Sequence, residues 1–206
     1  DADMDAFPLS ISDYGDGALM VHVGAPDESE RRQLIRRFRE RVLAEPPPGV
    51  DDVVSGLESL LVEFDPLRTT AEQVAFALGA LARVPAADEG APTRAQTFVV
   101  PIVVSPDTAP DLDSVADELA VDPDDVIDRL ERSELTVALL AAAMAPMLDG
   151  LDVPAPVRRR STPRTDVPTG SVMIAGRNAI IQPFPGPTGW RVVGRTPLGV
   201  VDVSSE

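Results

Sequence analysis

Residues 161–176 read STPRTDVPTGSVMIAG, and this stretch decides how the C-terminal third of the chain is interpreted. Its prolines fix φ, and Gly170 permits a sharp turn or a close backbone approach, directly before an apolar run that is typical of a β-strand. The stretch therefore either turns the chain between two strands or forms one wall of a pocket.

Arginine and hydroxyl side chains in and after this stretch support the pocket. The guanidinium groups of Arg164 and Arg195 are planar forks that suit a carboxylate or a phosphate, so a small anionic ligand is expected. The residues expected to bind it are Arg164, Ser171, Arg195 and Thr196, and those expected to shape the pocket are Pro168, Gly170, Gly189 and Trp190. The alternative is that both arginines satisfy carboxylates of the barrel or carbonyl oxygens of loops, and that the Pro-Gly pairs simply turn the chain. For Trp190, a place in the core or at a subunit interface is the favoured alternative.

Short apolar runs separated by proline and glycine follow Pro154 and predict the architecture of this region. Their spacing is typical of strands in a β-barrel or a sandwich. The predicted strands are 171–174, 179–181, 190–193 and 200–201. Before them, the run TFVVPIVV at 97–104 predicts an opening strand, and acidic or proline-containing turns predict helices at 111–119 and 123–130.

The first half of the chain alternates between strand and helix patterns. Strands are predicted at 18–23, 52–54 and 59–64, and helices at 27–44 and 71–84. This order predicts a small α/β sandwich of the ferredoxin-like, α+β type. Small and polar residues with Pro and Gly then predict a linker. The expected organisation is an N-terminal domain at 1–84, a linker at 85–95 and a second domain at 96–206.

The charge balance excludes several classes of partner and chemistry. Acidic residues number 34 and basic residues 18, which gives a net charge of −16. This field repels nucleic acid and anionic membrane surfaces. Every basic residue is an arginine, so neither a Schiff-base lysine nor the lysine of a phosphate loop is available.

The composition also bears on the compartment. No apolar run reaches the roughly 18 residues of a membrane span, and DADMDAFPLS at 1–10 lacks the basic-then-apolar order of a signal peptide. The absence of cysteine fits a reducing compartment, and a cytoplasmic location is expected. The lysine-free, alanine- and arginine-rich usage favours a bacterial source.

The chain offers little for acid–base or metal chemistry. His22 is the only histidine and lies in a strand-like run, where a structural role is favoured. One histidine without cysteine cannot build a zinc site, so no metal is predicted. Asp122, Asp124 and Asp125 are interpreted as residues of a helix start. No catalytic residue is assigned.

Three segments resemble the family of the 5-oxoprolinase B subunit, also labelled allophanate hydrolase subunit 1, which includes an inhibitor of a sporulation histidine kinase. They are SDYGDGAL at 12–19, SLLVEFDP at 59–66, and an ordered C-terminal set. That set comprises TPR at 162–164, VP at 167–168, GSV at 170–172, IAG at 174–176, GW at 189–190 and GRTP at 194–197.

The resemblance implies an α+β domain followed by a cyclophilin-like β-barrel. It implies one subunit of an ATP-dependent amide- or lactam-opening hydrolase, of the 5-oxoprolinase or allophanate hydrolase type. The implied partner is the C subunit of such enzymes, also called allophanate hydrolase subunit 2, in a heterodimer or heterotetramer. ATP is implied by the resemblance alone. The alternative is a non-catalytic protein, either a scaffold for the partner or a regulator of a histidine kinase.

Departures from the family pattern favour that alternative. A histidine of the family corresponds to Leu130, and two of its tyrosines correspond to Leu135 and Gln182. Two segments also differ. AAAMAP at 141–146 replaces a Gly-Phe-x-Pro-Gly-Phe loop, and GPTGW at 186–190 replaces Ser-Pro-Gly-Gly-Trp. The frame of the predicted barrel is kept while polar and aromatic pocket positions are lost. A diverged member with altered or lost activity is expected.

Overall fold

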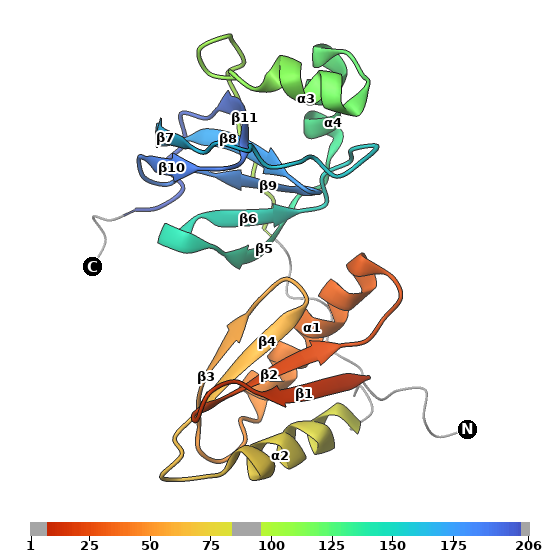
Figure 1. The fold of residues 1–206 in the computed structure, drawn as a ribbon, viewed down its shortest axis with the longest axis vertical. Coiled ribbons are helices and arrows are strands. Elements are labelled where there is room, and N and C mark those ends of the chain that lie inside the picture. Colours follow the sequence, from red (N-terminus) through yellow and green to blue (C-terminus); the bar gives the residue numbers. More distant parts are fainter. Residues whose placement is uncertain (1–7, 84–95, 203–206) are drawn as a thin grey trace. The chain divides into compact units, whose positions relative to one another are not determined.

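The computed structural model describes residues 8–83 and 96–202, and the chain divides into two compact units, Asp1–Gln96 and Thr97–Glu206 (Figure 1). The linker expected at 85–95 lies outside the described residues. Within them, no helix combines the length and the apolar character needed to cross a membrane.

The first unit is one antiparallel sheet with two helices. Its strands are β1 (Leu9–Asp13), β2 (Ala18–Val23), β3 (Val50–Ser55) and β4 (Ser59–Phe64), and its helices are α1 (Glu28–Ala44) and α2 (Ala71–Arg83). The sheet order β1-β2-β4-β3 places β4 between the two strands that α1 connects. This is a split β-α-β arrangement, in which the edge strand β1 comes first in the chain.

Both helices pack on one face of this sheet. The Asp27 side chain accepts a hydrogen bond of 3.0 Å from the Glu30 amide and so caps α1 at the predicted start. Ile35, Phe38 and Val42 lie one or two helical turns apart and are fully buried with the inward residues of β2 and β4. His22 alternates with those inward residues and is exposed.

The second unit begins with two helices and continues as strands (Figure 1). The helices are α3 (Leu112–Leu119) and α4 (Pro123–Arg132). The strands are β5 (Thr136–Leu140), β6 (Pro146–Asp149), β7 (Arg164–Val167), β8 (Ser171–Ala175), β9 (Asn178–Ile181), β10 (Gly186–Thr188) and β11 (Arg191–Arg195). A five-stranded sheet has the order β11-β8-β9-β6-β5, and β7 pairs with β10 in a separate two-stranded ribbon.

The five-stranded sheet is covered on both faces. Val172 and Ile174 of β8 lie in a core cluster with residues of α3 and α4. Met173, between them, lies in a second cluster that includes Val167 of β7 and the partly buried Trp190. All five residues of β8 are consequently buried, which explains why the four that follow Ser171 are all apolar, without alternation.

For this unit the barrel is not detected, and the structure corrects two predicted strands. No pairing among the described residues closes the sheet into the expected barrel, since β5 and β11 are its two edges. The run 97–104 is not a strand, because only Val103 pairs with a neighbour, and Pro101 has no N–H to donate to a ladder. Residues 200 and 201 are likewise not in a strand.

Two residues that depart from the family pattern lie in apolar surroundings. Leu130 is buried in the cluster beneath α3 and α4, and Leu135 packs against the same cluster. A histidine at position 130 or a tyrosine at position 135 would bring a polar group into this core. The loop at 141–146 contains a short 3-10 turn, Ala142–Met144, between β5 and β6.

Candidate functional site

Arg195 lies at the end of β11, where the segment before α3 meets the sheet. Its backbone is paired in both directions with Val103, at N–O distances of 2.7 and 3.0 Å. The preceding Gly194 makes this approach feasible, because a Cβ there would lie 2.4 Å from the Ile102 side chain. The base of the Arg195 side chain is therefore held by main-chain contacts on both sides.

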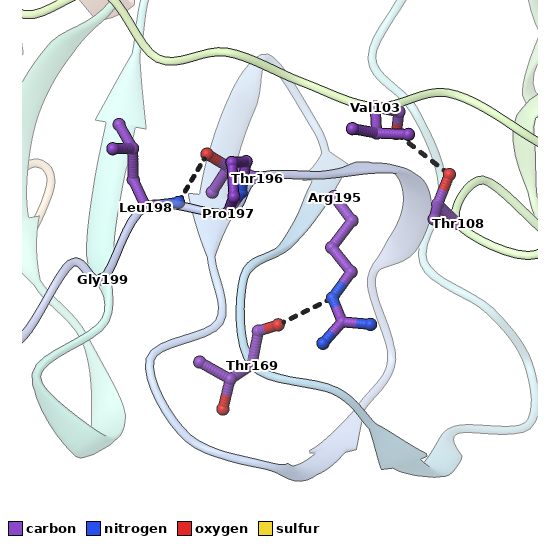
Figure 2. A pocket seen from close by; sticks show the side chains of 8 residues that line it. All are labelled: Val103, Thr108, Thr169, Arg195, Thr196, Pro197, Leu198 and Gly199. Carbon is purple, nitrogen blue, oxygen red and sulfur yellow. Dashed lines mark hydrogen bonds between the residues drawn. The ribbon is translucent and has the colours of Figure 1, made fainter.

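The Arg195 side chain borders a pocket of about 420 Å³ that is open to solvent (Figure 2). Its Nε donates a hydrogen bond of 3.1 Å to the Thr169 carbonyl oxygen. Its two terminal nitrogens have no partner among the described residues. The residues that line this pocket are Val103, Thr108, Thr169, Arg195, Thr196, Pro197, Leu198 and Gly199. A guanidinium group beside several threonines suits a small anion.

The turn at 168–170 packs directly on the strand that carries Arg195. Gly170 has φ +82°, and a Cβ at this position would lie 2.2 Å from the Thr196 carbonyl oxygen. The Thr196 amide donates a hydrogen bond of 2.8 Å to the Gly170 carbonyl oxygen. Only glycine satisfies both the left-handed conformation and the contact, so the proline- and glycine-rich stretch at 161–176 does form a pocket wall.

A second depression, of about 430 Å³, is also bordered by this turn, through Pro168 and Thr169. Arg195 and Thr169 border both depressions. The other residues that line the second one are Thr165, Asp166, Val167, Pro168, Pro185 and Gly186. Residues of β7 and β10 thus line the same depression as Arg195.

Arg164 belongs to a different cluster, built around a buried carboxylate. Asp111 precedes α3 and its side chain is only 2% exposed. It accepts hydrogen bonds from Arg164 Nη2 at 2.8 Å, from Arg164 Nε at 3.3 Å and from the Val192 amide at 2.9 Å. Arg160 forms a further ion pair with it. This Asp111 cluster ties the start of α3 to β7 and to β11.

The surroundings of Asp111 favour its ionised form. Burial alone would raise the pKa of this carboxyl, but the hydrogen bonds from Arg164 and the Val192 amide, with the charges of Arg164 and Arg160, lower the pKa below its ordinary value. Asp111 is therefore a structural anion, neutralised by two arginines.

Glu118 has a similar role near the other end of α3. Its side chain is 11% exposed and accepts from Arg158 Nε at 3.2 Å and from Arg191 Nη2 at 3.4 Å. The Arg158 amide also donates to it, at 2.7 Å. Arg158 and Arg160, from the triple-arginine run 158–160, thus serve the fold, whereas Arg159 lies over the Trp190 ring at 5.6 Å from its centroid.

The structure brings together some residues of the predicted site. Arg195, Thr196 and Pro168 line the depressions, and Gly170 forms the turn that supports them. Ser171 is buried within β8, and Gly189 and Trp190 line neither depression. Arg164 lines neither because it pairs with Asp111, which is the alternative left open for it by the sequence.

Sequence reasoning missed Thr108, Thr169, Asp166 and the anchoring role of Asp111. The first two carry no signal, since isolated threonines are common in turns. Asp111 was predicted only to start a helix. No sequence pattern indicates that its carboxylate is buried beside Arg160 and Arg164, about fifty positions later in the chain.

Comparison with known proteins gives a consistent family. A family model described as the carboxyltransferase domain, subdomain C and D, matches residues 9–206. A protein of Bacillus subtilis named as the B subunit of 5-oxoprolinase is 26% identical over 205 residues, which cover 92% of this chain and 83% of that protein. One of the same name from Haemophilus influenzae is 26% identical over 201 residues, covering 94% and 89% of the two chains.

Solved structures show the same fold. The conserved uncharacterized protein PH0987 of Pyrococcus horikoshii is 27% identical, with a TM-score of 0.52, and the match covers 95% of this chain and 89% of that one. The Kluyveromyces lactis urea carboxylase is 21% identical, with a TM-score of 0.75, over 91% of this chain and 19% of the larger one.

Proposed function

The chain belongs to the carboxyltransferase domain family, subdomains C and D, and on that premise we propose that it is one subunit of an ATP-dependent amide- or lactam-opening hydrolase. Its curated relatives are named as the B subunit of 5-oxoprolinase, which supports this class of enzyme. The proposed partner is a second carboxyltransferase-like protein, of the type called the C subunit or allophanate hydrolase subunit 2. The proposed location is the cytoplasm.

The observation that carries the proposal is the Arg195 pocket. Arg195 has unpartnered terminal nitrogens among the residues that the structure describes, while the arginines of the Asp111 cluster are engaged by a buried carboxylate. In a chain with a net charge of −16, an available guanidinium group in a hydroxyl-lined pocket favours a small carboxylate. The role of Arg195 is to bind and orient that carboxylate.

The fit of ATP to the described residues is poor. A triphosphate carries several negative charges, and the pocket offers one guanidinium group and no lysine. Neither depression is lined by a glycine-rich loop at a helix start, the usual cradle for phosphates. We therefore place the nucleotide chemistry of the proposed complex on its other subunits.

The same geometry limits the catalytic contribution of this chain. No histidine or cysteine lines either depression, and Asp166 is the one carboxylate among the lining residues. In the proposed complex this chain positions the substrate, while the partner supplies the general base that activates water.

The test is reconstitution. The chain is coexpressed with an allophanate hydrolase subunit 2 homologue from the same genome, and ATP hydrolysis that depends on 5-oxoproline is measured in the complete assembly. We expect a stable heteromer, and we expect Arg195→Gln to raise KM for 5-oxoproline at least tenfold through the lost charged hydrogen bond. Arg132→Gln, on the exposed last turn of α4, is the matched control. A well-folded assembly without turnover would contradict the proposal.

A second candidate function follows from the missing base. A scaffold or kinase regulator of this family needs no catalytic group, and Leu130 and Leu135 serve the core. Titration calorimetry separates the two candidates: binding of 5-oxoproline supports the hydrolase role, whereas no ligand heat beside tight binding of the partner supports the scaffold.

A further inference from the structure

The second depression is bordered by one positive and one negative side chain. Of the eight residues that line it, only Arg195 and Asp166 carry charge. The remainder are threonines, prolines, a valine and a glycine. The depression is thus a small, largely neutral space with a guanidinium group and a carboxylate at its border.

These two groups do not pair with each other. Arg195 Nε donates to the Thr169 carbonyl oxygen, and the Asp166 carboxylate accepts a hydrogen bond of 3.1 Å from the Thr165 hydroxyl. Among the described residues, neither forms an ion pair. Opposite charges elsewhere in this unit do meet, as Arg164 and Asp111 show. Two opposite charges that share a depression without pairing are available to bind a third species.

The two charged residues lie on different strands. Asp166 lies in β7, which is paired with β10, and Arg195 is the last residue of β11, paired with β8 on one side and with Val103 on the other. The turn between β7 and β8 contains Pro168, whose φ is fixed, and Gly170, whose conformation and contact with Thr196 admit no other residue. Strand pairing and this turn therefore hold the main chain that carries the two charged residues.

We propose that this second depression binds a small amphoteric molecule of the amino-acid class, with its carboxylate on Arg195 and its ammonium group on Asp166. The inference goes beyond the proposed function, with which it shares Arg195: the proposed function places 5-oxoproline, a plain carboxylate, in the first pocket, and the amino acid is placed in this second depression. A plain anion would meet the Asp166 carboxylate and the negative field of the chain. An ammonium group on the same molecule would instead be attracted to the Asp166 carboxylate.

Matched pairs of ligands test the proposal. Titration calorimetry on the full chain compares glycine with acetate, β-alanine with propionate and γ-aminobutyrate with butyrate. Each pair differs only in the ammonium group, and the series lengthens the distance between the charges. We expect at least one amino acid to bind about fivefold more tightly than its deaminated acid, the contribution of one partly exposed ion pair.

Two substitutions assign the charges. Asp166→Asn should weaken binding of the preferred amino acid and strengthen binding of its deaminated acid, so that the preference for the amino acid disappears. Arg195→Gln should weaken binding of both the amino acid and its deaminated acid. Asp128→Asn and Arg132→Gln, on α4, are the matched controls and should leave the preference unchanged.

The outcomes are distinct. Equal binding within every pair, tighter binding of the acids, or no binding by any ligand of the series overturns the proposal. A preference that survives Asp166→Asn also overturns it. Failure of the reconstituted complex to hydrolyse ATP leaves the ligand preference measurable, so the two proposals fail separately.

Discussion

The Asp111 cluster and the Arg195 pocket use the same residue type in opposite ways. In the cluster, Arg160 and Arg164 converge on one buried carboxylate, whose pKa they lower. In the pocket, Arg195 holds only a backbone carbonyl and leaves its terminal nitrogens to solvent. Burial of the anion makes the difference. A desolvated carboxylate must be neutralised by the fold, whereas a solvated guanidinium group remains available to a ligand.

The comparison also separates stability from binding. The cluster ties three segments together, so its loss should lower the stability of the whole second unit. The pocket is held by main-chain contacts that do not depend on the Arg195 guanidinium group. Loss of that group should therefore mainly weaken ligand binding. Trp190 is the only tryptophan and lies in the second unit, which makes its fluorescence a probe for the unfolding of that unit.

The largest expected effect is that of Asp111→Ala. Removing the anion leaves two arginines without their partner and the Val192 amide without its acceptor. We expect the free energy of unfolding to fall by about 3 kcal/mol, the lower end for a broken buried pair because both arginines reach solvent. Urea unfolding followed by Trp190 fluorescence measures it. Asp117→Ala, exposed on the same helix, is the control, and equal losses in both variants would refute the structural role of the cluster.

The second effect is that of Gly170→Ala. The new Cβ meets the Thr196 carbonyl oxygen in a conformation that alanine rarely adopts, so the turn must shift away from the pocket. We expect a loss of about 2 kcal/mol together with weaker ligand binding. Gly189→Ala is the matched control, because a Cβ there meets nothing within 4 Å. A variant at Gly170 as stable as that control would show that the close contact does not exist.

The third effect is a dependence on acid. The pKa of Asp111 is lower in the folded chain than its ordinary value of 3.8, so its stabilisation is complete above that value. The stabilisation is lost as the pH falls through the lower, folded pKa. The difference in unfolding free energy between the wild type and Asp111→Asn should thus be constant near neutral pH and shrink below about pH 4. A difference that stays constant down to about pH 2 would contradict the ionised state of Asp111.

The smallest effect on stability is that of Arg195→Gln. The substitution keeps the strand and removes a head group that is exposed, so the free energy of unfolding should change by less than about 0.5 kcal/mol. Binding of a carboxylate should still weaken clearly, as measured by calorimetry. Should this variant prove as unstable as Asp111→Ala, the contrast between the two regions would be lost.

Local patterns predicted most of the secondary structure of the first unit. Asp27 and the stripe of Ile35, Phe38 and Val42 located α1, because capping and helical periodicity depend on neighbours within a few residues. The family resemblance drawn from short motifs was confirmed by the match over residues 9–206. The sequence also singled out Gly170, which the structure shows in a conformation that demands glycine.

Pairing across the chain was beyond those patterns. The run 97–104 has a strand-like composition and yet pairs with the β11 edge only through Val103. Pro101 has no N–H to donate to a ladder. The predicted barrel likewise required that β5 and β11 find each other, which the described residues do not show. Register and closure arise from contacts between distant residues.

The sequence by itself determined the helices, the turn at Gly170, the acidic and lysine-free chemistry, and the family of this protein. Only the tertiary structure decided which arginine is free. Arg164 follows a proline and Arg195 a glycine in similar turn-rich motifs, but Asp111 lies beside the first and not the second. The physical reason is that a charged side chain is engaged or available according to its neighbours in space, and chain folding brings those neighbours from far along the sequence.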